Sequence, residues 1–167
     1  MRELYNKLGE KTYRYVAVAL CFLGDLELSK YLYDKFTTPA LFNKNFDQAM
    51  ILLKLVYKKQ GVEFEVPLNF KEQLYTTVVH GVLLILGLYL VFHFMIDTFF
   101  VFKKRFAHIY IKMLSWTATF LAPLMGYVVF KDWPVYGTLF ILQGFFFFFV
   151  AWGLHIYPVL PASKKSS

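Results

Sequence analysis

Three side chains spaced one helical turn apart are the first candidates for chemistry. Tyr89, His93 and Asp97 recur every four residues, so they share one face if the segment is helical. The segment around them, 78–102, is otherwise almost wholly apolar, and a carboxylate in such a setting must face a polar partner. His155 lies in another apolar segment, and a rise of ~1.5 Å per residue places it near the depth of Asp97. We therefore expect Asp97 and His155 to pair.

Two functions fit this polar group. It is either a proton-handling or quinone-edge site, or a structural hydrogen bond that fixes the register of the helices. Haem ligation needs two histidines at one depth, whereas His93 and His155 differ by roughly 9 Å along their helices. A haem- or quinone-associated anchor subunit therefore stays an alternative. The sequence contains no paired metal-ligand motif, phosphate-binding loop or nucleophile motif, so we expect no metal site and no enzyme.

A basic stretch directly after the first apolar segment is a candidate lipid site. Four cations alternate there with Phe102, Phe106 and Tyr110, namely Lys103, Lys104, Arg105 and Lys112. Cations at headgroup level beside aromatic anchors bind anionic phospholipids such as cardiolipin. The alternative is a plain topology signal. We expect no cofactor other than such a lipid.

The elements that position these residues are long apolar helices. Segment 78–102 would be about 37 Å long as a helix, which exceeds the ~30 Å hydrocarbon core of a bilayer. Two further apolar segments, 113–130 and 135–157, follow it. We predict an all-α membrane protein whose three transmembrane helices occupy 73–158, followed by a basic tail, 159–167.

One of these helices carries a stripe of small residues. Ala118, Ala122 and Gly126 recur every four residues in the second span. Small side chains let neighbouring membrane helices approach closely, so we expect the stripe to be a packing face.

Residues 1–72 are predicted to form a small helical region outside the membrane. Apolar periodicity favours helices over 12–23 and 26–36, with Gly24 and Asp25 as the break of an antiparallel hairpin. A further amphipathic helix is expected over 47–59. The alternative is a set of helices that lie on the membrane surface. The first fifteen residues mix acids and bases and fit neither a secretory signal nor a transit peptide, so we expect no cleaved presequence.

Charge in the loops predicts the orientation. The loop after the first span is strongly basic, and the tail carries Lys164 and Lys165, whereas Lys131 and Asp132 cancel in the loop between the second and third spans. With three spans the two basic segments lie on one side, which the positive-inside rule assigns to cytosol, mitochondrial matrix or stroma.

Composition narrows the class of partner. The chain has 167 residues, 21% aromatic residues and a net charge of +7. In a membrane protein this charge favours anionic headgroups or acidic partner subunits, not nucleic acid. In size, basicity, aromatic content and lack of a presequence signal, the chain resembles the supernumerary subunits of mitochondrial respiratory-chain complexes. The resemblance implies a non-catalytic accessory subunit of the mitochondrial inner membrane, held by other subunits and by lipid.

The last four residues offer a different location. They read KKSS, which matches the dilysine signal that retrieves membrane proteins to the endoplasmic reticulum. An endoplasmic reticulum membrane protein is therefore a second hypothesis.

Overall fold

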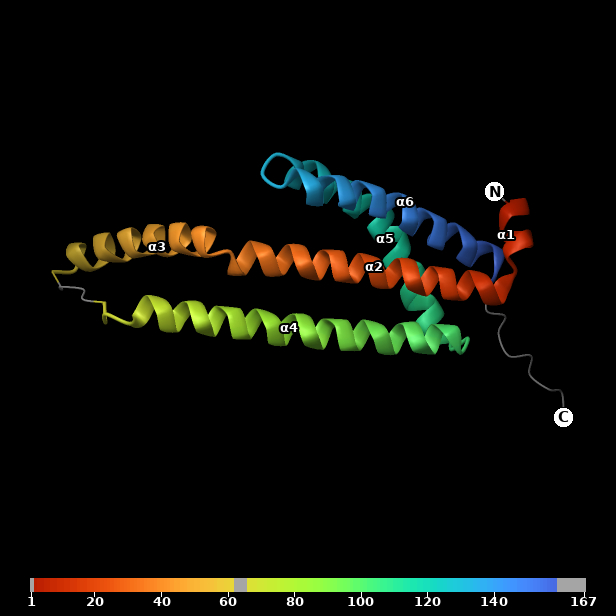
Figure 1. Cartoon of the computed structure of the whole chain (residues 1–167), viewed down its shortest axis with the longest axis horizontal. Coiled ribbons are helices and arrows are strands. Elements are labelled where there is room, and N and C mark those ends of the chain that lie inside the picture. Colours follow the sequence, from red (N-terminus) through yellow and green to blue (C-terminus); the bar gives the residue numbers. More distant parts are fainter. Residues whose placement is uncertain (1, 62–65, 159–167) are drawn as a thin grey trace. The chain divides into compact units, whose positions relative to one another are not determined.

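The fold was analysed in a computed structural model, which describes residues 2–61 and 66–158. Those ranges contain helices and no strands. The helices are α1 (Arg2–Leu8), α2 (Glu10–Thr37), α3 (Pro39–Lys59), α4 (Phe70–Val101), α5 (Arg105–Phe130) and α6 (Pro134–Ile156) (Figure 1).

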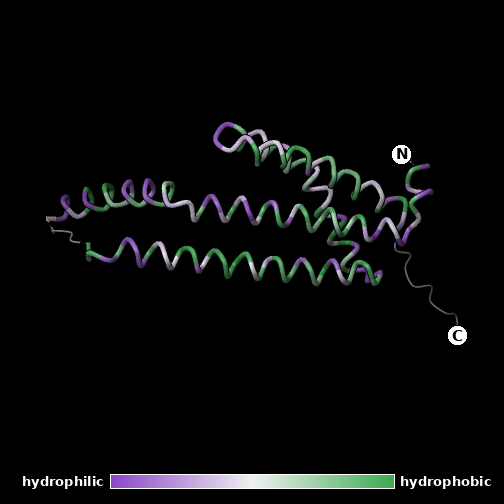
Figure 2. The backbone as a smooth tube through the Cα atoms, in the orientation of Figure 1, coloured by the Kyte–Doolittle hydropathy of each residue, from purple (hydrophilic) through white to green (hydrophobic). Residues whose placement is uncertain are grey.

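The predicted fold class is confirmed: the chain is an all-helical membrane protein with three helices long and apolar enough to span a bilayer. These helices are α4, α5 and α6. Figure 2 shows hydrophobic residues along most of α4 and α6, whereas hydrophilic residues are frequent along α3. Two spans begin earlier than the apolar segments do, α4 at Phe70 and α5 at Arg105. A helix continues through the polar headgroup layer, whereas hydropathy marks only its hydrocarbon-facing part.

The described residues group into two compact units. A terminal unit joins Met1–Glu27 to Leu90–Ser167, and a central unit comprises Leu28–Tyr89. The boundaries fall inside α2 and α4, not at the predicted border near residue 72. Where the membrane surface crosses the chain stays a prediction.

The hairpin expected around Gly24 and Asp25 is wrong, because α2 is one continuous helix. Gly24 does not end the helix. A Cβ atom there would lie 2.0 Å from Gln143 Nε2 of α6, so the glycine makes room for a neighbouring helix. Asp25 does not cap a helix either, because its carboxylate contacts α4.

In the terminal unit, α5 and α6 pack as an antiparallel pair (Figure 1). Glycines bring their backbones together: a Cβ at Gly126 would lie 2.6 Å from the carbonyl oxygen of Gly137. Gly144 similarly makes room for Pro123, whose Cγ would lie 2.3 Å from an added Cβ. Close backbone approach is the usual means of packing membrane helices.

The N-terminal helices pack against α6. Tyr5 and Tyr13 are fully buried, and their hydroxyls donate to the carbonyl oxygens of Phe149 and Val150. Burial raises the pKa of Tyr5 to about 12, so this hydroxyl keeps the proton that it donates. Gly153 faces the Tyr13 ring, where an added Cβ would lie 2.1 Å from Cε2.

In the central unit, α3 packs against the first part of α4. Lys71 pairs with Asp47 at 3.0 Å, and the Tyr75 ring lies edge-on to Phe42. The Tyr75 hydroxyl also donates to the Thr37 carbonyl at the end of α2. These contacts are few, and no residue of α3 is buried.

Candidate functional site

A cluster of polar side chains lies buried where α2, α4 and α5 meet in the terminal unit. His93 of α4 is its centre. Its Nδ1 lies 2.9 Å from Asp25 Oδ2 of α2, and its Nε2 lies 3.1 Å from the Tyr110 hydroxyl of α5. Asp25 and His93 are 4% and 6% exposed, so bulk water does not weaken this hydrogen bond.

Both protonation states of His93 suit this geometry. The Asp25 carboxylate only accepts, so Nδ1 of His93 carries the hydrogen that it donates. In neutral His93, Nε2 then accepts from Tyr110; in protonated His93, Nε2 donates to the Tyr110 oxygen. A phenol hydroxyl serves as donor or acceptor by rotating. The imidazole can therefore gain or lose a proton while all three side chains stay in place.

Asp97 lies one turn beyond His93, as its spacing predicted, and is 4% exposed. It interacts electrostatically with Asp25 and His93, yet its Oδ2 has no hydrogen-bond partner in the described part of the chain. Cys21 of α2 lies near the two carboxylates of the cluster. Burial raises the pKa of its thiol, and the carboxylates of Asp97 and Asp25 raise it further. The thiol is therefore a neutral neighbour.

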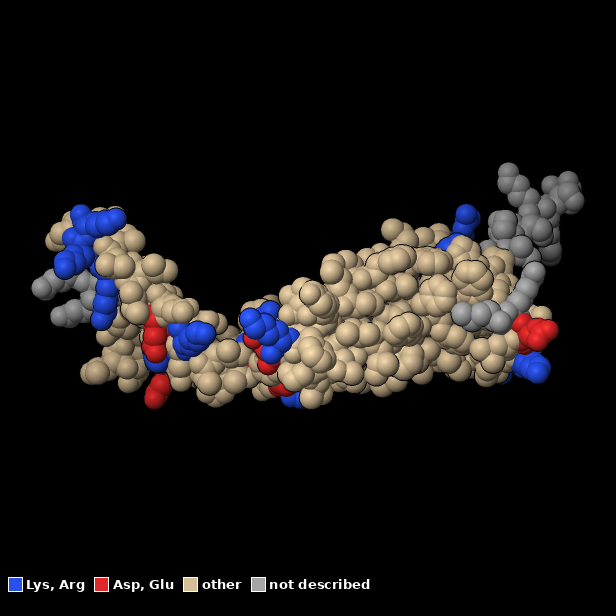
Figure 3. All heavy atoms as spheres, turned by 90° about the horizontal axis from the view of Figure 1, so that it is seen from above, with Lys and Arg blue, Asp and Glu red and all other residues tan. Residues whose placement is uncertain are grey.

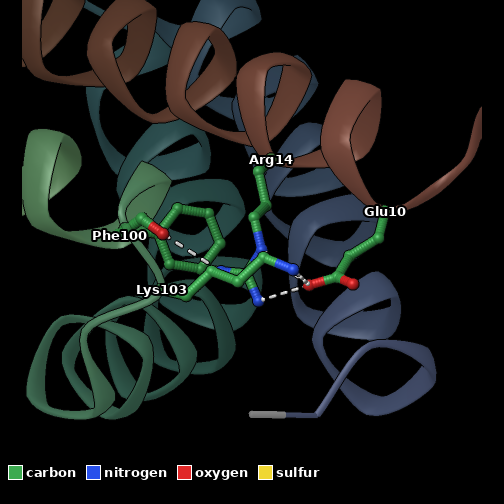
Figure 4. A network of polar contacts seen from close by, with 4 residues as sticks. All are labelled: Glu10, Arg14, Phe100 and Lys103. Carbon is green, nitrogen blue, oxygen red and sulfur yellow. Dashed lines mark hydrogen bonds and ion pairs between the residues drawn. The ribbon is translucent and has the colours of Figure 1, made fainter.

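A second polar network holds α2 against the end of α4, next to the cluster (Figure 4). Arg14 is 2% exposed; its Nη1 donates to the Phe100 carbonyl, and its Nη2 lies 3.1 Å from Glu10 Oε1. Lys103 Nζ approaches the same Glu10 oxygen at 2.9 Å. One carboxylate thus joins two cations from different segments, and this fixes where α2 lies along α4.

The turn after α4 presents Lys103 for this contact. Lys103 has a φ of 58°, a left-handed conformation that usually belongs to glycine. The Lys103 and Lys104 amides donate to the Phe100 and Phe99 carbonyls, the hydrogen-bond pattern of a Schellman helix end. A lysine here accepts a strained backbone, and its side chain gains the ion pair with Glu10.

The expected pair of Asp97 and His155 is wrong. His155 is exposed, and its ring lies edge-on to Trp116 at 5.7 Å. The acid that contacts His93 comes from α2, a helix that was predicted from the sequence to lie outside the membrane. Tyr89 lies one turn before His93 and is half-buried in the central unit.

The basic residues divide into two kinds. Lys103 is engaged by Glu10, whereas Lys104 and Arg105 are exposed at the start of α5. Lys112 is half-buried two turns further along α5. The two exposed cations are adjacent and remain placed for contact with a headgroup.

The small-residue stripe is used unevenly. Gly126 contacts α6, as described above, and Ala118 packs against the buried core of the terminal unit. Ala122 is half-buried.

Sequence reasoning missed two members of the cluster, Asp25 and Tyr110. Asp25 was interpreted as a helix cap, and Tyr110 as an aromatic anchor beside the basic residues. One signal was present: Asp25 is an acid set between Leu23, Gly24 and Leu26, and an acid in apolar surroundings needs a partner.

The geometry also bears on haem. Both ring nitrogens of His93 lie at hydrogen-bond distance from protein groups, so iron ligation would displace Tyr110 or Asp25. The haem alternative therefore gains no support from this histidine.

Comparison with known protein families, with curated proteins and with solved structures found no match.

Proposed function

We propose that the chain is a non-catalytic accessory subunit of a large membrane complex. The observation that carries this proposal is the bare apolar surface of α3. Ile51, Leu52, Leu55 and Val56 are each exposed by half or more, and α3 is not among the helices apolar enough to span. Such a surface is typical of a protein contact.

The spans support the same proposal. Only 11% of the most apolar window of α4 is buried within the chain. The space-filling view likewise shows a broad surface free of charged side chains (Figure 3). Lipid tails can cover such helices. Because Lys54, Lys58 and Lys59 interrupt α3, this helix does not lie among the lipid tails, and in this proposal a partner protein covers its apolar side chains.

A photo-crosslinking residue at Leu52, in cells, tests the proposal. We expect one or a few discrete protein adducts, and native gels on which the chain migrates far above its own 19.7 kDa. Lys54 is the matched control, because residues two apart on a helix point about 200° away from each other. Adducts to lipid alone, or migration as a single chain in a micelle, would contradict the proposal.

The mitochondrial inner membrane is the location that we propose, with the respiratory chain as the complex. Basicity and aromatic content favour it, and co-migration with a respiratory complex after digitonin extraction would test it. The endoplasmic reticulum is the alternative, favoured by KKSS, which lies outside the described residues. Replacing Lys164 and Lys165 by serine would move the protein to the Golgi only under that alternative.

Anionic phospholipid is part of the proposal. Lys104 and Arg105 support it, because they are exposed side by side next to Phe106, which is 53% exposed. Native mass spectrometry of the purified chain should show retained phospholipid that K104A/R105A loses. Lys131→Ala, in the turn after α5, should retain it. Equal retention by all three proteins would remove the lipid part.

A further inference from the structure

The buried cluster contains one more acid than base. Its ionisable members are the carboxyls of Asp25 and Asp97, the His93 imidazole, and two groups that stay neutral near pH 7, Tyr110 and Cys21. With both acids charged and His93 neutral, the cluster would hold two negative charges away from water. Buried charge without compensation is strongly unfavourable, so the cluster must keep at least one extra proton.

Asp97 is the acid that keeps this proton. The Asp25 carboxylate already accepts a hydrogen bond from His93 Nδ1. Asp97 Oδ2, by contrast, is buried without a donor. A buried charged acceptor that lacks a donor is unfavourable, and protonation of this carboxylate removes the charge that makes the site unfavourable.

A route to the outside runs through the other members. Tyr110 is half-buried, whereas Asp25, His93 and Asp97 are buried. A proton that arrives through the Tyr110 hydroxyl binds His93 Nε2, and the Nδ1 proton then passes to the Asp25 carboxylate. Exchange with Asp97 requires one further transfer, from Asp25 to the neighbouring Asp97 carboxylate. The imidazole is neutral again after these steps, and the reverse sequence releases the proton.

We propose that Asp25, His93, Tyr110 and Asp97 form a proton-exchange site, in which Asp97 holds the proton and Tyr110 with His93 conducts it. This site does not depend on the accessory-subunit function. It assigns an exchangeable ligand, one proton, to a chain whose other features are structural.

Titratable groups of the described residues face the cluster from two further helices, Cys21 and Asp25 from α2 and Tyr110 from α5. From α6, the amide of Gln143 donates to the Leu20 carbonyl, one residue before Cys21. Arg14 and His108 lie beyond the cluster, around Phe100 at the end of α4.

Infrared difference spectroscopy of the full chain in lipid nanodiscs tests this proposal. We expect a carboxylic-acid carbonyl band at pH 7 that Asp97→Asn removes. Burial raises the pKa of Glu27 to about 7, so a Glu27 band is identified separately by its loss in Glu27→Gln. The exposed Asp132 of the α5–α6 turn provides the control, since Asp132→Asn should keep the band. Transfer into D2O should shift the band, which shows that the proton exchanges.

Tyr110→Phe then tests the route. It should keep the band but slow its shift in D2O on the order of a hundredfold, the usual effect of losing one positioned proton-transfer group. Tyr127→Phe is the matched control, because Tyr127 is an 80% exposed tyrosine on the same helix. The proposal would be overturned if the band were absent, or if its D2O shift were equally fast in Tyr110→Phe. It would also be overturned if Na⁺ added at fixed pH removed the band, because the site would then bind a cation in place of a proton.

Discussion

The apolar part of α4 continues from the central unit into the terminal unit, but its surroundings differ between the two units. All the buried residues of this helix, His93, Ile96, Asp97 and Phe100, lie in its last part, within the terminal unit. The part within the central unit has none, although it includes the uninterrupted run of apolar residues before Tyr89. Hydropathy therefore indicates which residues avoid water, and the polar exceptions indicate where another helix of the same chain lies.

The same contrast separates the glycines of the two units. Gly24, Gly126, Gly137, Gly144 and Gly153 in the terminal unit each make room for a neighbouring atom, whereas Gly81 and Gly87 in the central unit have nothing within 4 Å. A glycine in a membrane helix thus marks a contact only in one half of the molecule.

Substitution of these glycines is the strongest way to test the contrast. Gly153→Ala should destabilise the chain by about 2–3 kcal/mol, because its Cβ would overlap the buried Tyr13 ring and overpacking is unfavourable. Gly87→Ala should range from neutral to about 1 kcal/mol more stable, since alanine is the better helix former. Unfolding by SDS in mixed micelles measures both, and equal changes would contradict the contrast.

Cations provide the next test. Arg14→Met keeps the side-chain stem but removes the contacts with Glu10 and Phe100, so we expect a loss of about 2 kcal/mol. Lys30→Met, in the central unit, removes an exposed ion pair with Asp34 and should change stability by less than about 0.5 kcal/mol. The same micelle titration measures both variants. A similar loss in each would mean that the Arg14 network does not hold α2 in place.

At the Lys103 turn we expect a smaller difference in stability, between the glycine and the alanine variant of this residue. Both Lys103→Gly and Lys103→Ala lose the ion pair with Glu10, but only alanine keeps the strain of a φ of 58°. The glycine variant should be more stable by about 1 kcal/mol. Equal stability would show that the left-handed turn is not maintained in the membrane.

We expect the smallest effect on stability at Glu10, and this effect depends on pH. The hydrogen bond from Lys103 lowers the pKa of Glu10 below its ordinary 4.5, and Arg14 lowers it further, against the effect of burial. The folded chain therefore favours the carboxylate, and this contribution is present above pH 4.5 and lost as pH falls through the lowered pKa. Unfolding curves from pH 6 to 3 should show a decline that is weaker in Glu10→Gln. Glu72→Gln should decline like the unsubstituted chain.

Much of the fold could be predicted because hydrocarbon imposes a simple rule. Backbone groups must bond within the segment, so a long apolar run is a helix. Segment 113–130 lies within α5, and 78–102 and 135–157 lie within α4 and α6 apart from their last residue. The packing role of Gly24 within the continuous helix α2 could not be predicted, because it depends on Gln143, whose side chain fills the space beside this glycine. Nothing local at Gly24 reveals a neighbour that lies more than a hundred residues away.

Two of the four residues of the candidate site could be predicted, because polar side chains stand out in an apolar span. His93 and Asp97 both lie in the apolar helix α4. Asp25 and Tyr110 lie in segments of mixed polarity, where an acid or a tyrosine has many ordinary roles. Only the packing of three helices reveals that these side chains meet.

The attachment of the first helices to the last one sets an order for biogenesis. Tyr13 donates to a carbonyl 137 residues later, and the Tyr157 hydroxyl donates to the Tyr5 carbonyl across 152 residues. Ribosomes therefore make Tyr5 and Tyr13 long before α6, which carries the acceptor of each hydroxyl, exists. During synthesis α1 and α2 therefore lack their packing partner. The terminal unit assembles only after α6, the final span, has entered the bilayer.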